Sequence, residues 1–322
     1  MAENVVNMIV LGPSRVGKTS LLATMYNEFS KLGGSFNFRA IGETSDLLGD
    51  AYQRLSDVMQ KDRFTVVGDL MPGNKDFLEH RFEVSFQGAK EFEIVFHDYR
   101  GGTLMKVTDP EFPELKSKVA ASHVIFNVLD AVALMESDPF QSDKLNAHNR
   151  VFELLSETLK ANEKYLIVFV LVKCEAYMKS AEKRESLLDR FQDRHKSVLS
   201  LLGKLNESGR NVAAVLIPVK TLGCVEFKEL VIEEGQTEPS FVFMRTHREF
   251  APQDVDQPLR YALPFALNHV NENRSFFDSA WRYISGKSVA FKHALKEFCN
   301  HRNREDGKVY RKYGNSELLE VK

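Results

Sequence analysis

The segment GPSRVGKT, at residues 12–19, has the residue types and spacing that bind phosphate groups. It fits the pattern GxxxxGK[ST], in which backbone N–H groups of a loop surround the phosphates and the positive end of a following helix adds favourable potential. Gly17 allows close approach of the chain, Lys18 would reach the β- and γ-phosphates, and the Thr19 hydroxyl would bind Mg²⁺. We therefore expect nucleotide contacts from Gly12, Ser14, Arg15, Val16, Gly17, Lys18, Thr19 and Ser20.

A strand and a helix must position this loop. Residues 5–11 form a short apolar run rich in β-branched side chains, ended by a glycine and a proline, which predicts a buried strand. A helix is predicted from about Lys18 to Lys31. The motif therefore has the context that phosphate binding requires, which favours a site over a glycine turn that binds nothing.

Asp98 is the second candidate for chemistry. It follows the apolar segment FEIVFH and opens DYRGG, so that Gly101 completes a DxxG pattern. In HRFEVSFQGAKEFEIVFHD the apolar residues alternate on both sides of Gly88, which predicts an antiparallel hairpin whose second strand ends at Asp98. An acidic group at this place is typically held near Mg²⁺ in phosphate-loop proteins. An ordinary turn is the alternative.

The rest of the chain predicts an α/β sheet protein. Further apolar runs at 124–129, 166–172 and 213–218 are separated by helical patterns near 144–161 and 185–207. This alternation indicates a mostly parallel sheet with helices on both faces. Helical spacing also predicts an inserted helix between the first helix and the hairpin, over residues 43–62, with Leu48, Tyr52, Leu55 and Met59 on one face.

We predict one nucleotide-binding domain over residues 1–223, followed by an elaboration packed on it over 224–300. The elaboration contains a second hairpin, then helices near 257–272 and 275–299. Its aromatic residues have helical spacing and are interpreted as core rather than as a stacking platform; they are Phe276, Phe277, Trp281 and Phe291. Residues 301–322 are polar and are expected to form a loosely ordered, solvated tail.

The segments GPSRVGKT, DYRGG, LVKCE and IPVKTLG, at successive strand ends, resemble the Ras-like translation-factor class of GTPases. Within that class the bacterial double-GTPase-like branch is the nearest match, and the resemblance covers about residues 5–223. It implies a Ras-like, three-layer P-loop fold with GTP or GDP and Mg²⁺ as ligands. The predicted hairpin agrees, because this class has its second strand antiparallel to its third.

The base-reading motif of that class, [NT]KxD, corresponds here to LVKCE, so the resemblance implies that Lys173 and Glu175 contact the base. Val172 replaces the polar first residue of the motif. A glutamate keeps the hydrogen-bond acceptor, and the lysine stem can lie along the base. Lys220 lies where the class has its final base-contacting loop. GTP is thus the expected nucleotide, and an ATPase is the alternative function. As the alternative to base contacts, Lys173 and Glu175 would only begin a solvated helix.

The sequence gives fewer candidate residues for catalysis than for nucleotide binding. Gly102 replaces the glutamine that many members of the class carry after DxxG to orient water. Arg100 lies in the same loop and is our candidate, with Lys18, for stabilising charge on the γ-phosphate; a surface ion pair is the alternative. We expect slow hydrolysis, with a protein partner supplying missing groups. A nucleotide-binding interaction module with negligible hydrolysis is the other reading.

A threonine that senses the γ-phosphate through Mg²⁺ is expected before the hairpin. Thr65 is the nearest candidate and Thr44 is the second, although neither lies in a recognisable motif. If this segment orders only around a triphosphate, it forms the switch of a regulatory GTPase.

Composition argues against nucleic-acid binding and against a membrane-spanning helix. The 322 residues contain 43 Lys and Arg against 45 Asp and Glu, a net charge of -2, so no overall positive field attracts nucleic acid. No apolar run approaches the ~20 residues of a membrane-spanning helix. Three widely spaced cysteines fit a reducing compartment, and we expect a cytoplasmic protein whose effector is unknown.

Overall fold

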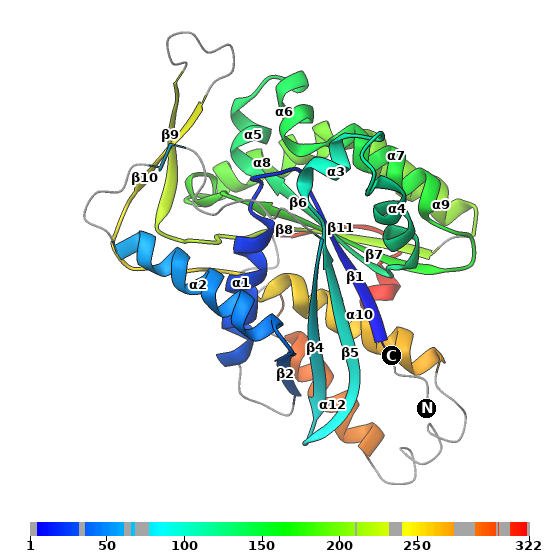
Figure 1. Ribbon diagram of the computed structural model, residues 1–322. Helices are drawn as coiled ribbons and strands as arrows, with labels where there is room; N and C mark the ends of the chain where they lie inside the picture. Colours follow the sequence, from blue (N-terminus) through cyan, green and yellow to red (C-terminus); the bar gives the residue numbers. More distant parts are fainter. Residues whose placement is uncertain are drawn as a thin grey trace.

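The computed structural model describes residues 5–31, 36–60, 66–67, 77–209, 211–231, 240–273, 287–300, 302 and 310–320. Its main sheet has eight strands in the order β11-β8-β7-β6-β1-β5-β4-β2 (Figure 1). In chain order these strands are β1 (Val5–Leu11), β2 (Phe36–Ile41), β4 (Leu78–Phe86), β5 (Ala89–Asp98), β6 (Val124–Asp130), β7 (Lys164–Val172), β8 (Asn211–Pro218) and β11 (Arg311–Gly314).

The centre of this sheet is parallel. Strand β1 pairs in parallel with β5 and β6, and β6, β7 and β8 continue in the same direction. Strand β4 runs antiparallel to β5, as the alternating apolar residues around Gly88 predict. The predicted fold class, a mostly parallel α/β sheet with one antiparallel hairpin, is confirmed.

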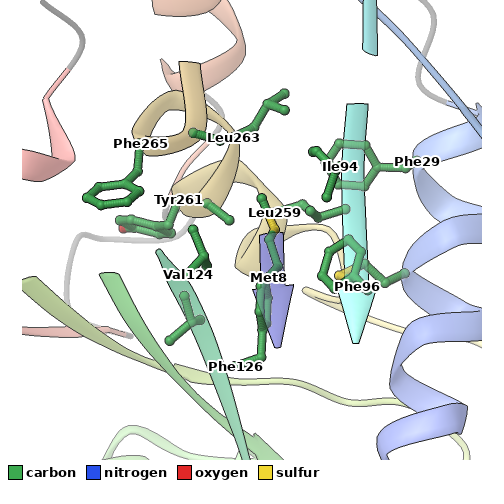
Figure 2. Close-up of a cluster of buried hydrophobic side chains, with 14 of the residues drawn as sticks. Met8, Phe29, Ile94, Phe96, Val124, Phe126, Leu259, Tyr261, Leu263 and Phe265 are labelled. Carbon is green, nitrogen blue, oxygen red and sulfur yellow. The ribbon is translucent and has the colours of Figure 1, made fainter. Parts of the chain in front are cut away.

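Helices cover both faces of the sheet, because successive residues of each strand point to opposite sides. In β1, Met8 faces the core that includes α1 (Lys18–Lys31), α10 (Gln257–Asn273) and α12 (Lys287–Asn300). Figure 2 shows this layer, where side chains of α10 lie over those of β1 and β6, and Phe29 of α1 lies beside Ile94 of β5. Ile9 faces the second core. The helices that contribute to that core include α4 (Phe112–Ala121), α7 (His148–Thr158), α8 (Ala181–Arg194) and α9 (Lys196–Glu207).

The inserted helix is present as α2 (Thr44–Gln60), which buries Leu48, Leu55 and Met59. The two longer helical patterns are each interrupted: α6 (Pro139–Asn146) and α7 meet at Ala147, where φ is 57°, and α8 and α9 meet at His195. The short helices α3 (Gly101–Met105) and α5 (Ala131–Glu136) follow β5 and β6. No helix among the described residues is both long enough and apolar enough to cross a bilayer.

A second, three-stranded sheet has the order β3-β10-β9. The hairpin of β9 (Val225–Val231) and β10 (Ser240–Arg245) is the one that the sequence predicts, while β3 (Val66–Val67) adds a strand from the segment before β4. The hairpin projects from the main sheet beside α2 (Figure 1), where an Arg245 guanidinium N–H donates to the Met59 carbonyl. The small sheet therefore joins the inserted segment to the elaboration.

Two differences from the sequence-based expectations concern segments of the chain. Strand β2 was not predicted and pairs with β4 along the sheet edge. The expected loosely ordered tail is wrong for residues 310–320, because β11 pairs with β8 and the η2 turn (Ser316–Leu319) buries Leu319 completely. Phe291 is buried as expected, whereas Phe276, Phe277 and Trp281 lie outside the described residues.

Candidate functional site

The glycine-rich loop between β1 and α1 folds around the end of its own lysine. Lys18 Nζ donates to the carbonyl oxygens of Gly12, at 2.9 Å, and Pro13, at 3.2 Å. Left-handed backbone at Arg15, with φ 69°, and unusual φ angles at two glycines, including 115° at Gly17, produce this curl. Because the loop leads directly into a 14-residue helix, the N–H groups of the first helical turn have no partner within the helix and point toward the loop with the positive end of the helix dipole. This geometry suits an anion.

The ammonium of Lys18 is largely withdrawn from water, with 8% of the residue exposed. Burial lowers the pKa of Lys18, and the negative charge of Asp98 opposes that shift. Two carbonyl oxygens hold the ammonium until an anion competes for it. A phosphate oxygen offers a stronger, charge-assisted hydrogen bond in the same low-dielectric setting.

The DxxG turn, from Asp98 to Gly101, packs directly against the glycine-rich loop of residues 12–19, which we call the phosphate loop. Asp98 ends β5 in register with Val10 of β1 and is completely buried. At Gly101, which begins α3, an added Cβ would lie 2.1 Å from the backbone nitrogen of Ser14 and 2.2 Å from the carbonyl carbon of Pro13. Only glycine fits between the two loops. The structure thus brings together the two motifs that the sequence analysis singled out.

The residues expected to hold Mg²⁺ supply suitable atoms. Thr19 lies partly exposed in the first turn of α1 and offers a hydroxyl, and Asp98 offers a carboxylate at the end of β5, which pairs with the strand that leads into the loop. Mg²⁺ prefers oxygen ligands and binds through one or two carboxylates together with substrate phosphates and water. Among the described residues no group of three or more His, Cys, Asp or Glu is placed to hold a metal. A magnesium bound mainly by phosphate does not need one.

Lys173 connects the end of β7 to the phosphate loop. Its Nζ atom donates to the carbonyl oxygen of Arg15 at 3.3 Å and to Oδ2 of Asp130 at 2.5 Å. Asp130 ends β6, and its other oxygen caps α5 by accepting from the N–H groups of Val132 and Ala133. Asp130 was not among the residues predicted from the sequence. Its signal was an acidic residue between an apolar strand and a helix, the pattern of an N-cap.

Glu175 lies at the same edge but contacts the loop after β8. Its Oε1 atom accepts from the N–H groups of Leu222, at 3.4 Å, and Gly223, at 3.3 Å. The residue is 6% exposed, and burial raises the pKa of its carboxyl to about 7. The alternative of a solvated helix start is therefore wrong for Glu175. Lys220, in the same loop, donates to the side-chain oxygen of Gln253 at 2.9 Å.

Arg100 makes the ion pair that the sequence analysis offered as the alternative to catalysis. Its Nη2 atom lies 2.8 Å from Oδ2 of Asp109 and 4.0 Å from Oε2 of Glu111, with 40% of the arginine side chain exposed. All three residues belong to the stretch from the DxxG turn to the start of α4. The ion pair is therefore present, and a role of Arg100 in catalysis stays a prediction.

The two candidate threonines are placed differently. Thr65 lies outside the described residues, one position before β3. Thr44 begins α2, is buried, and accepts a hydrogen bond from the Arg81 N–H at 2.9 Å. Its hydroxyl therefore joins α2 to β4.

No protein-family model and no curated protein matches the chain. Among solved structures, the chain is similar to the GTPase-like domain of Ski7 from S. cerevisiae, bound to GDP and inorganic phosphate. The TM-score is 0.37 and the identity 15%, over 67% of this chain and 43% of the other. The fold and the site described above rest on this chain's own strands and motifs.

Proposed function

We propose that the protein binds a purine nucleoside triphosphate together with Mg²⁺, that the nucleotide is GTP, and that the protein hydrolyses it slowly to GDP. The observation that carries the proposal is the phosphate loop curled around Lys18, with the Asp98–Gly101 turn seated on it. A strand, a glycine-rich loop, a helix and an acidic strand end in this arrangement are suited to binding a triphosphate.

The reaction would be attack of water on the γ-phosphorus, which forms one P–O bond and breaks the bond to the oxygen bridging the β- and γ-phosphates. Lys18 and the loop N–H groups would stabilise charge on the oxygens that they contact. Thr19 and Asp98 would hold Mg²⁺, which would neutralise charge on the β- and γ-phosphates. Gly102 has no side chain to orient the water, which supports slow turnover.

Guanine preference is proposed from the end of β7. Lys173 already contacts the phosphate loop, so its stem would lie along a base that follows the phosphates. Glu175, when ionised, can accept hydrogen bonds from the ring N–H and amino group of guanine, whereas adenine lacks that pair of donors. Lys220 belongs to the loop that would border the base. If GTP and ATP bind equally, the ATPase alternative replaces the guanine assignment.

We also propose that the protein acts as a nucleotide-dependent switch with a protein partner. The ion pair of Arg100 with Asp109 favours low intrinsic hydrolysis, because it holds the only arginine of the DxxG turn in place. A partner that breaks this pair, or that supplies its own arginine, would raise the rate. With negligible hydrolysis the protein would act as a nucleotide-binding interaction module. The described cysteines are free thiols, which supports the proposed cytoplasmic location.

Calorimetry with GTP, GDP, a non-hydrolysable GTP analogue and ATP, each with Mg²⁺, tests the proposal. Lys18→Ala should abolish triphosphate binding, and Lys31→Ala, at the exposed far end of the same helix, is the matched control. Phosphate release by the wild-type protein then separates a slow GTPase from a binding module. Unchanged affinity and turnover in Lys18→Ala would remove the site assignment.

A further inference from the structure

Phe243, on the central strand of the small sheet, lies beside the lysine that we assign to the base. Lys173 Nζ is 5.8 Å from the centre of the Phe243 ring, and the same atom contacts the phosphate-loop carbonyl of Arg15. We propose that Phe243 forms the aromatic wall of the purine-base site. This inference rests on the proposed function and adds to it a base-contacting residue from the C-terminal elaboration.

The ring of Phe243 is half-buried, so it is held in place and still presents a surface. Its neighbour across the hairpin is Phe227, with ring centroids 6.2 Å apart and an interplanar angle of 75°. Phe241 contacts the same Phe227 ring at 6.2 Å. Edge-to-face contacts of this kind orient aromatic rings. Phe243 is thus packed against Phe227 on the hairpin, while Lys173 Nζ lies over its ring.

The backbone of Phe243 is fixed on both sides. It is in register with Phe227 of β9 and with Val66 of β3, and Arg245, two residues further on, donates to the Met59 carbonyl of α2. A ring placed by two strand partners is positioned before any ligand arrives. Such preorganisation lowers the entropy cost of binding, because little side-chain or loop ordering is left to occur.

The chemistry of the two side chains matches a base rather than a phosphate. A planar base stacks on an aromatic ring and on the apolar stem of a lysine. The ammonium of Lys173 donates to Asp130 and to the phosphate-loop carbonyl, so its stem and the neighbouring ring, rather than its charge, would contact the base. A purine nucleotide is the ligand that uses both the loop and this surface.

The test compares Phe243→Ala with Phe241→Ala, a control on the same strand that also contacts Phe227. Calorimetry with Mg²⁺ would measure the affinity for GDP and for inorganic tripolyphosphate, which has no base, and thermal unfolding would monitor the fold. We expect Phe243→Ala to weaken GDP binding about 10-fold or more, as loss of base stacking does elsewhere. Its tripolyphosphate affinity should be unchanged. Phe241→Ala should behave like the wild type, and Phe243→Tyr should retain GDP binding.

Two results would overturn the inference while leaving the proposed function standing. One is an equal loss of GDP affinity in Phe243→Ala and Phe241→Ala, and the other is an equal loss for GDP and tripolyphosphate in Phe243→Ala. Either would mean that the ring supports only the fold. A wild-type protein that binds neither nucleotide nor tripolyphosphate would overturn the proposed function and this inference together.

Discussion

Gly101 lies so close to Ser14 that a Cβ atom at position 101 would be 2.1 Å from the Ser14 backbone nitrogen. The next glycine in the chain is different, because a Cβ on Gly102 would meet no atom within 4 Å. Two adjacent glycines in one turn thus have unequal tolerance for a methyl group. Comparing alanine substitutions at these two glycines therefore tests the contact between the DxxG turn and the phosphate loop alone.

Gly101→Ala should displace the phosphate loop or the turn, because backbone atoms on the other side cannot move aside as a flexible side chain can. We expect nucleotide affinity to fall at least about 10-fold and stability by about 1–3 kcal/mol, the usual cost of overpacking. Gly102→Ala should leave both properties near wild-type values. Binding of a fluorescent guanine nucleotide and urea unfolding would measure them. Equal effects of the two substitutions would contradict the proposed contact.

Asp130 is predicted to position Lys173. Asp130→Asn keeps an oxygen that can cap α5 but removes the charge that faces the ammonium. Nucleotide affinity should fall about fivefold, corresponding to about 1 kcal/mol for a partly exposed pair. The melting temperature should change little.

Asp138→Asn is the matched control for that substitution. Asp138 caps α6 with the same geometry, accepting from the N–H groups of Phe140 and Gln141 through one oxygen. Its replacement should leave nucleotide affinity unchanged. If both variants weaken binding alike, the effect of Asp130 comes from helix capping and not from Lys173.

Glu175 should make guanine binding depend on pH. Burial raises the pKa of its carboxyl to about 7, so a large fraction is protonated in the free protein at neutral pH. Guanine needs the ionised carboxylate as an acceptor, and GDP affinity should therefore rise from pH 6 to pH 8. The slope cannot exceed about tenfold per pH unit for one proton.

ADP is the ligand control for this titration, because its phosphates ionise as those of GDP do. Glu175→Gln is the protein control, since glutamine does not titrate. The pH slope should be steeper for GDP than for ADP in the wild-type protein, and the difference should vanish in Glu175→Gln. Equal slopes for both ligands in the wild-type protein would show that Glu175 only anchors the loop at residues 222–223.

The parts of the site that were predictable from the sequence are those set by neighbouring residues. The β-branched run before Gly12, the motif itself and the alternation around Gly88 each act over a few residues, and together they predict that the loop leading to Lys18 and the turn at Asp98 follow adjacent strands. The strand register then brings the two motifs together, because Val10 and Asp98 pair once β1 and β5 are parallel neighbours. No tertiary information was needed for this half of the site.

The missed features depend on residues far apart in the chain. Asp130 meets Lys173 across 43 positions, and Val66 pairs with Phe243 in a strand too short to leave a pattern. Strand β2 did leave a signal, since Phe38 and Ala40 are buried while Asn37 and Arg39 are exposed. That alternation has the period of a strand, so a signal for β2 is present in the sequence.

The C-terminal segment shows why polar composition alone misleads. Leu319 is completely buried beyond β11, although most residues around it are polar or charged. Leu319→Ala should reduce the free energy of unfolding by about 2–5 kcal/mol, the usual cost of a cavity at a buried leucine. Lys312→Ala, at an exposed position of β11, should have little effect. Urea unfolding of the full chain measures both variants. An unchanged unfolding free energy in Leu319→Ala would mean that the segment is solvated, as its composition first indicated.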